Sequence, residues 1–450
     1  MKYQSINPYS GELLREYEQD AFPDLEISTI AYSRWSRLPI AERAVQLTKL
    51  ARLIDSRKEE YAHLITTEMG KPYREALYEI NKVLTAFEYY TVHAAAMLKP
   101  QIVQTVASKS YIAYEPLGVI FSIMPWNFPF WQVFRFAVPT LMAGNVTILK
   151  HAPCVPQCAA AIEGAFQEAG LMSGLLLSLY LSNEDAALLI AHSKIAGVSF
   201  TGSDITGANI ASTAGKAIKK CVIELGGNDA FIVLEDADIE LAVAAAVKSR
   251  SINSGQSCNA AKRFIVTEGV YDNFLKKLIE AVQLLQVGNP MLDTTHIGPL
   301  ARRDLTLKVR KQITDTLAQG AIPWYHSFEP QEDSNFVAPI VLADVKPFMT
   351  AFNEEIFGPV WSVIKASSSQ DAIRLANLSQ YGLGASIWSS DSVAAEKMAT
   401  ELEVGNVFIN EIVKSDARLP FGGIKRSGVG RELSEVGLKE FVNIKTIFIH

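Results

Sequence analysis

The apolar run Val119-Ile120-Phe121-Ser122-Ile123-Met124, which Pro125 follows, decides how this chain folds. Its length and its apolar character are typical of a strand buried inside a parallel sheet. Pro125 cannot donate a hydrogen bond to a neighbouring strand, so the strand is expected to end there. A helix is predicted to begin near Trp131. A buried strand that leads into a helix is the first half of a βαβ unit.

Strands and helices alternate outward from this unit. Further strands are predicted at 146–149, 198–201, 221–224, 231–234 and 263–266, with helices at 159–167 and 239–250. Residues 40–97 are predicted to be helical, and residues 98–116 to form an amphipathic pair of strands. The alternation predicts an α/β fold with a largely parallel sheet, followed by a second α/β unit over 236–425. Ligands are expected at the carboxyl ends of the strands.

Composition narrows the class of protein. The 450 residues are 49% hydrophobic and 20% charged, as in a soluble globular protein of two or three domains. A formal net charge of −6 speaks against nucleic-acid binding. No apolar run is long enough for a membrane helix, and the N-terminus has no signal region, so a cytoplasmic protein without membrane partners is expected. The four scattered cysteines indicate neither disulfides nor a metal site.

Two glycine-rich turns carry the candidate chemistry. Cys258 ends the run Asn253-Ser254-Gly255-Gln256-Ser257-Cys258, and Glu224 precedes Gly226-Gly227 at the end of a predicted strand. A thiol nucleophile and a carboxylate base suggest covalent catalysis through a thioester. Asn127, after Pro125-Trp126, can offer a side-chain amide to an oxyanion. Each residue also has an ordinary interpretation: a buried small hydrophobe, a strand-end carboxylate and a turn residue.

Together with Asn353-Glu354-Glu355-Ile356-Phe357-Gly358-Pro359, these motifs resemble those of the aldehyde dehydrogenase superfamily, from about residue 5 to the end of the chain. The resemblance implies an aldehyde dehydrogenase-like fold that forms a homodimer or homotetramer. Its parts are a Rossmann-like cofactor-binding domain (1–97 and 117–235), an α/β catalytic domain (236–431) and a small β oligomerisation element (98–116 and 432–450). In such enzymes Cys258 attacks the aldehyde, Asn127 stabilises the oxyanion, and Glu224 activates the water that hydrolyses the thioester.

The resemblance also implies a site for NAD or NADP. Its residues are Trp126, Lys150, Gly202, Ser203, Glu355 and Phe357: Lys150 contacts the adenosine ribose, Gly202 and Ser203 lie at the pyrophosphate, and Glu355 and Phe357 lie at the nicotinamide end. The run after the strand at 198–201 is not G-x-G-x-x-G. Pro153 stands where many NAD-specific members have a glutamate that repels NADP. No new basic partner for a 2′-phosphate is evident except His151.

The substrate class depends on Arg135 and Ser415. An unpaired arginine in the apolar segment around Trp131 would be costly unless it had a function, although it can also be a structural cation. Together with Lys150-His151-Ala152-Pro153, these residues most resemble the bacterial NAD(P)-dependent succinate-semialdehyde dehydrogenases, where they bind the substrate carboxylate. The small-molecule substrate is then succinate semialdehyde or a similar carboxy-aldehyde. The alternatives are a broad-specificity aliphatic or aromatic aldehyde dehydrogenase, and a non-catalytic structural or binding protein on this fold.

Overall fold

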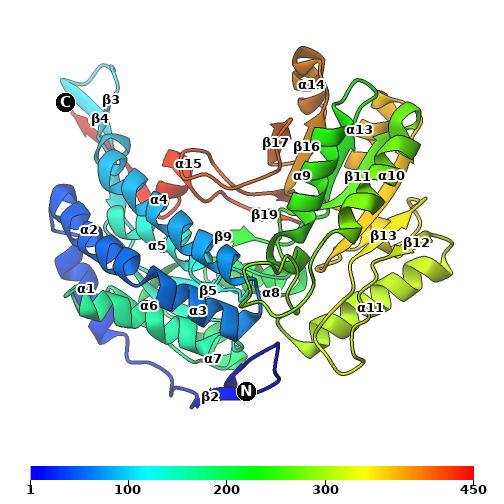
Figure 1. Cartoon of the computed structure of the whole chain (residues 1–450). Helices are drawn as coiled ribbons and strands as arrows, with labels where there is room; N and C mark the ends of the chain where they lie inside the picture. Colours follow the sequence, from blue (N-terminus) through cyan, green and yellow to red (C-terminus); the bar gives the residue numbers. More distant parts are fainter. Residues whose placement is uncertain (1) are drawn as a thin grey trace.

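The computed structural model describes residues 2–450 and shows two α/β lobes, with a β-arm projecting from the first (Figure 1). The first lobe is built on a six-stranded sheet of order β19-β9-β8-β5-β6-β7, parallel except for β19. The predicted strand β5 lies centrally in it. The strands are β5 (Val119–Met124), β6 (Val146–His151), β7 (Leu176–Ser178), β8 (Ile195–Thr201), β9 (Lys220–Glu224) and β19 (Gly428–Val429).

Helices surround this sheet. They are α1 (Glu26–Trp35), α2 (Ile40–Ser56), α3 (Lys58–Met69), α4 (Tyr73–Met97), α5 (Trp131–Met142), α6 (Pro156–Glu168), α7 (Asn183–Ala191) and α8 (Asp204–Lys216). The predicted helical stretch 40–97 is therefore three helices. Gly70 ends α3 with φ +85°, a left-handed conformation that glycine adopts without strain, and Pro72 immediately precedes α4. A hairpin of β1 (Tyr3–Ile6) and β2 (Leu13–Tyr17) lies at the start of the chain.

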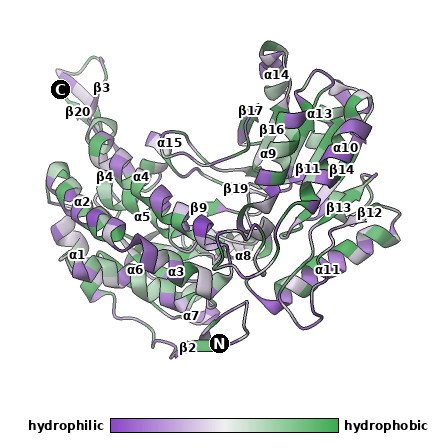
Figure 2. Ribbon diagram, viewed as in Figure 1, coloured by the Kyte–Doolittle hydropathy of each residue, from purple (hydrophilic) through white to green (hydrophobic). Residues whose placement is uncertain are grey.

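The second lobe has a seven-stranded sheet of order β12-β13-β14-β11-β10-β16-β17, parallel except for β12. Figure 2 shows that the strands of this sheet are largely hydrophobic, as buried parallel strands must be. The strands are β10 (Asp229–Val233), β11 (Ala261–Thr267), β12 (Ile322–Tyr325), β13 (Ile340–Ala343), β14 (Val360–Ala366), β16 (Gly384–Trp388) and β17 (Asn406–Ile409). The helices are α9 (Ile239–Ser251), α10 (Glu268–Gln283), α11 (Arg303–Ala318), α12 (Thr350–Asn353), α13 (Ser369–Asn377) and α14 (Ser392–Ala399).

The two sheets divide the chain earlier than the predicted boundary at 235. β10 lies within the segment 117–235 but pairs with β11 and β16 of the second sheet. β19 lies within 236–431 but pairs with β9 of the first. The chain therefore crosses between the sheets at the glycine turn between Glu224 and Asp229. Alternating strands and helices do not reveal this, because the pattern does not say which sheet a strand joins.

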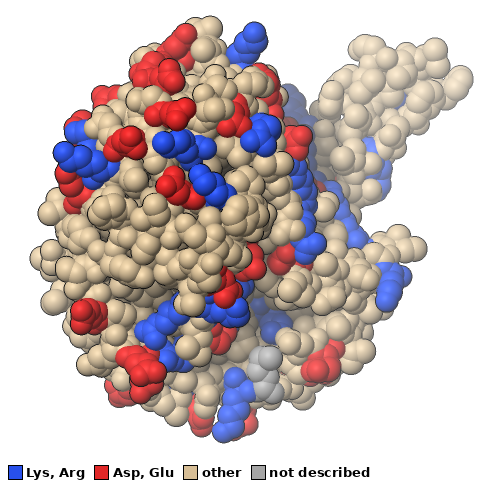
Figure 3. Space-filling view, turned by 90° about the vertical axis from the view of Figure 1, so that its right-hand side faces the viewer, with Lys and Arg blue, Asp and Glu red and all other residues tan. Residues whose placement is uncertain are grey.

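The arm is a three-stranded antiparallel sheet of β3 (Gln101–Ile102), β4 (Lys109–Pro116) and β20 (Val442–Ile449). It confirms the predicted strand pair in 98–116, and its role in oligomerisation stays a prediction. The short elements β15 (Tyr381–Gly382), β18 (Ile424–Lys425) and α15 (Ser434–Leu438) complete the fold. Acidic and basic side chains are interspersed on the face shown in Figure 3. Among residues 2–450, no helix is long and apolar enough to cross a membrane.

Candidate active site

A cavity of about 700 Å³ opens beside Cys258. Its walls come from α4 and α5 of the first lobe and from the segments 247–260 and 411–415 of the second. Three of the predicted site residues line it: Cys258, Arg135 and Ser415. Residues that are far apart in the sequence therefore share one space with the candidate nucleophile.

Cys258 follows a tight turn, η1 (Ile252–Gly255), at the end of α9. Asn253 and Ser254 have φ values of +53° and +54°, which are uncommon for residues other than glycine. Gly255 packs so closely against the backbone of Gly358 that a Cβ there would lie 2.3 Å from the Gly358 carbonyl oxygen. The turn is therefore held in a strained conformation by its surroundings, as is frequent at catalytic sites.

Two asparagines connect this turn to the one after β5. Asn253 Nδ2 donates to the backbone carbonyl of Asn127 at 2.6 Å. Asn127 Nδ2 donates to the carbonyl of Gln256 at 3.1 Å. An amide nitrogen has two hydrogens, so one N–H of Asn127 remains for another acceptor. The structure thus fixes Asn127 next to the loop that carries Cys258.

Burial dominates the electrostatics of the Cys258 thiol. It raises the pKa of Cys258 to about 11, and the carboxylates of Glu355 and Glu224 act in the same direction. The cations Arg135 and Lys262 oppose this shift and lower the pKa of the thiol. The resting thiol is therefore protonated near neutral pH, and it needs a base or added positive charge to become a nucleophile.

Lys262 is a buried residue that the sequence motifs did not indicate. Its Nζ donates to the carbonyls of Ser257, Cys258 and Ala260 at 3.0, 2.6 and 3.1 Å. It also lies 3.3 Å from Oε1 of Glu355, which is one of the predicted cofactor residues. One ammonium group thus connects the backbone around the thiol to the Glu355 motif.

Glu224 ends β9 and is buried, but it does not line the cavity. Burial raises the pKa of Glu224 well above its usual range, and the neighbouring carboxylate of Glu432 raises it further. Arg135 and Arg431 act in the opposite direction. Its Oε1 has no hydrogen-bond partner within residues 2–450, so this carboxyl group is poised to hold a proton.

Arg135 is also buried, on α5, with its guanidinium 5.2 Å from the ring centroid of Phe421. Its Nε forms an ion pair with Glu432, a residue that sequence analysis missed. Nη2 has no hydrogen-bond partner within residues 2–450. Arg135 is therefore not an ordinary surface cation. It lines the cavity, and Glu432 is already its counterion.

Ser415 also has a neighbour that the sequence motifs did not indicate. Lys82 on α4 donates from Nζ to Ser415 Oγ at 2.7 Å. The same ammonium lies 4.6 Å from the ring centroid of Trp131, and both residues line the cavity. No motif marks Lys82, which is one charged position in a long helix.

The candidate cofactor residues lie at the carboxyl edge of the first sheet. Lys150, near the end of β6, pairs with Ile123 of β5, which in turn pairs with the end of β8. Gly202 and Ser203 then lead from β8 into α8. Within residues 2–450 the buried Lys150 ammonium has no carboxylate within 4.0 Å, so its charge is not already neutralised by an ion pair. Ser203 is the N-cap of α8, so the positive end of that helix faces this edge.

At the other end of this edge, Glu355 lies directly on the glycine turn. It accepts a hydrogen bond from the N–H of Gly227 at 3.1 Å. The rings of Trp126 and Phe357 meet edge to face at 5.9 Å. A carboxylate for ribose hydroxyls beside two aromatic rings fits the nicotinamide end of a dinucleotide.

His151 does not supply a basic partner for a 2′-phosphate. Its Nε2 bonds to the carbonyl of Pro129 at 2.9 Å, and its Nδ1 accepts from the N–H of Ala152 at 2.9 Å. Burial lowers the pKa of His151 to about 4, so the imidazole is neutral. Because Pro153 stands where many NAD-specific members have a glutamate, this edge lacks that carboxylate. The neutral His151 adds no positive charge in its place.

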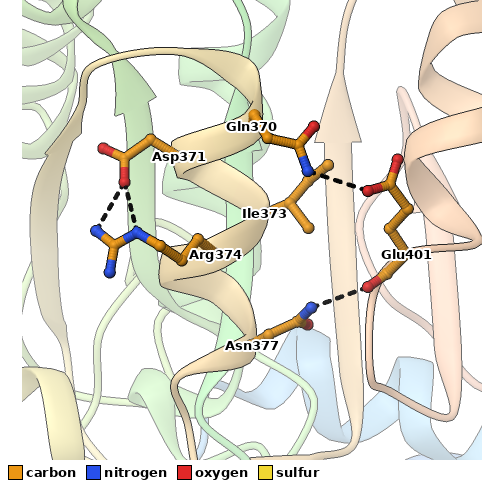
Figure 4. A pocket seen from close by; sticks show the side chains of 6 residues that line it. All are labelled: Gln370, Asp371, Ile373, Arg374, Asn377 and Glu401. Atoms are coloured by element: carbon orange, nitrogen blue, oxygen red, sulfur yellow. Dashed lines mark hydrogen bonds and ion pairs between the residues drawn. The ribbon is translucent and has the colours of Figure 1, made fainter.

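An open hollow on α13 shares no residue with the cavity at Cys258 (Figure 4). Its polar groups bond to one another: Gln370 and Asn377 reach Glu401, and Arg374 pairs with Asp371. The hollow is therefore separate from the candidate chemistry at Cys258. Within residues 2–450, no cluster of His, Cys, Asp and Glu side chains is suited to a metal ion.

A model of the aldehyde dehydrogenase family matches residues 1–447. The chain belongs to the aldehyde dehydrogenase family. The resemblance in the sequence motifs is thereby confirmed. A solved structure of succinic semialdehyde dehydrogenase from Streptococcus pyogenes, in complex with NADP+, is 37% identical with a TM-score of 0.96, over 99% of each chain. The predicted α/β fold of this aldehyde dehydrogenase is confirmed as well.

Two curated relatives of this aldehyde dehydrogenase are similar over the whole chain. A probable NADP(+) succinate-semialdehyde dehydrogenase of Synechocystis sp. is 45% identical and covers 100% of both chains. A succinate semialdehyde dehydrogenase of Escherichia coli, named for NAD(P)+, is also 45% identical over 99% of this chain and 97% of the relative.

Proposed function

We propose that this aldehyde dehydrogenase oxidises succinate semialdehyde, or a similar short aldehyde with a terminal carboxylate, to the free acid with NAD or NADP. The observation that carries the proposal is the shared cavity: the Cys258 thiol and the cations Arg135 and Lys82 line the same space. A short molecule with an aldehyde at one end and a carboxylate at the other suits such a space. The names of the relatives at 45% identity support the same substrate.

In the proposed reaction, the Cys258 thiol gives up its proton to solvent, and the resulting thiolate attacks the aldehyde carbon. The free N–H of Asn127 and the backbone N–H of Cys258 donate to the oxyanion. When bound, NAD(P)+ supplies the hydride acceptor. Loss of hydride from the adduct leaves a thioester on Cys258. Glu224 takes a proton from the water that attacks this thioester, which releases the acid and restores the thiol.

A broad-specificity aldehyde dehydrogenase is the second candidate. The cavity is large for a four-carbon substrate, and aromatic residues such as Phe128, Trp131 and Phe421 line it.

Steady-state kinetics with succinate semialdehyde, butyraldehyde and benzaldehyde, each with NAD+ and NADP+, separate the candidates. We expect kcat/KM for succinate semialdehyde to exceed that for butyraldehyde at least about tenfold, the effect of one charge-assisted hydrogen bond. Equal values would favour broad specificity. No aldehyde-dependent NAD(P)H formation would mean a non-catalytic protein.

A further inference from the structure

Lys82 is a partly buried cation with no counterion in ion-pair range. Its Nζ donates to Ser415 Oγ at 2.7 Å and lies 4.6 Å from the centroid of the Trp131 ring. Among residues 2–450, no carboxylate lies within 4.0 Å of this ammonium, although ion pairs are present elsewhere in the cavity wall. A desolvated charge of this kind is costly unless an anion reaches it.

Two carboxylates, Glu79 and Asp416, act electrostatically on Lys82, and both are engaged by other partners. Glu79, on the same helix, pairs with Lys71 at 2.5 Å and accepts the backbone N–H groups at the start of α5. Asp416 pairs with Arg418 at 2.6 Å. Neither carboxylate is placed to neutralise Lys82, so the positive charge on α4 remains directed at the cavity.

Arg135 differs from Lys82 in this respect, because Glu432 already balances its charge. Ser415 Oγ accepts its hydrogen bond from Lys82, and its own O–H therefore remains free to donate. We propose that Lys82 is a specificity-determining residue: it contacts the carboxylate of the substrate and orients the Ser415 hydroxyl to donate to the same group. The proposal rests on the proposed function, since it assigns the charge that selects a carboxy-aldehyde.

The preference for a charged substrate then depends on pH. Burial lowers the pKa of Lys82 to about 8, and Arg135 lowers it further, while Cys258, Glu79 and Asp416 raise it. Lys82 is charged below this pKa and neutral above it. The ratio of kcat/KM for succinate semialdehyde to kcat/KM for butyraldehyde should therefore fall as pH rises through about 8. Taking the ratio cancels the titration of Cys258 and Glu224, which act on both substrates.

The test compares Lys82→Met and Lys82→Arg with the unmodified enzyme, and uses Lys49→Met, an exposed position on α2, as the matched control. At neutral pH, Lys82→Met should lower kcat/KM for succinate semialdehyde at least about tenfold and change that for butyraldehyde less than about twofold. Lys82→Arg should retain part of the preference and lose the fall above the pKa of Lys82, because a guanidinium stays charged. Thermal melting curves check that each variant is folded.

The outcomes distinguish the two proposals. If the unmodified enzyme prefers succinate semialdehyde but Lys82→Met lowers both substrates equally, or neither, the role of Lys82 is refuted and the proposed function stands. If the unmodified enzyme shows no preference between the two aldehydes, both are refuted.

Discussion

At the scale of single residues, the carboxyl groups of Glu224 and Glu432 share one cation. Both are buried, and burial raises the pKa of each above its usual range. Arg135 pairs with Glu432 and lowers the pKa of both groups. Glu432 thus has two effects on the proposed base: its negative charge favours a protonated Glu224, and it occupies the arginine that would favour the ionised form.

Glu432→Gln should therefore lower the pKa of Glu224. A general base acts only when deprotonated, so hydrolysis of the thioester is lost as pH falls through the pKa of Glu224. In the variant this loss should occur at lower pH. Rapid-quench measurement of acyl-enzyme decay against pH tests this, with the exposed Glu435→Gln on α15 as the control. A pH profile that stays in place, or moves upward, would contradict the coupling.

At the scale of elements, the glycine turn after β9 and the loop before Cys258 both pack against the segment 353–359. The first contacts a side chain of this segment, and the second contacts its backbone. A Cβ on Gly226 would lie 2.1 Å from Oε2 of Glu355, the end of a flexible side chain. A Cβ on Gly255 would meet the rigid backbone of Gly358 at 2.3 Å, at a φ of +80°. The first substitution displaces a side chain, and the second strains the chain itself.

Gly226→Ala should therefore weaken cofactor binding with little change in stability. Displacing Glu355 removes a proposed ribose contact, and we expect Kd for NADP to rise about tenfold, the equivalent of one lost hydrogen bond. Gly255→Ala should instead destabilise the fold by more than about 1 kcal/mol. Cofactor titration and denaturant unfolding measure the two effects. The account of the turn is wrong if Gly226→Ala binds NADP normally.

The predicted catalytic residues lie on turns next to strands. Cys258, Glu224 and Asn127 stand in short motifs whose neighbours make the turn, so the local sequence indicates them. Lys82 lies in the middle of α4, and its partner Ser415 is 333 positions further along the chain. Helical periodicity marks a charged position there and no more, because only tertiary packing brings the two together.

The sequence motifs did not indicate Glu432 and Lys262, for a related reason. Each acts through a partner that folding supplies: Glu432 through Arg135, and Lys262 through the backbone around Cys258 and through Glu355. The strand pattern predicted β5, β6, β8 and β11 well, because each of these buried parallel strands has a largely apolar run. It could not assign β10 and β19 to their sheets, since pairing depends on the path of the chain between them.

At the scale of the whole molecule, both lobes contribute residues to the cavity, and the arm contributes none. Ile444 and Phe448 are exposed by 62% and 53% on the same face of β20, and no arm residue lines the cavity at Cys258. Exposed apolar side chains on one face of a projecting sheet favour a covered interface. We propose that the arm joins copies of this chain in a homodimer or homotetramer.

Phe448→Asp should therefore shift the protein toward smaller species, because it places a charge in the proposed interface. Analytical ultracentrifugation measures the mass directly. Asn443→Asp, an exposed polar position on the same strand, is the control and should leave the mass unchanged. An unchanged mass for Phe448→Asp would remove this face from the interface.

One measurement tests the central claim most directly. Glu224→Gln is mixed rapidly with succinate semialdehyde and NADP+, quenched, and analysed for NADPH and for the intact and peptide masses. The account predicts a burst of up to one NADPH per active site, followed by a stall, with the mass of one succinyl group added at Cys258. Turnover at the unmodified rate, or an acyl group on Cys154, Cys158 or Cys221 and none on Cys258, would contradict it.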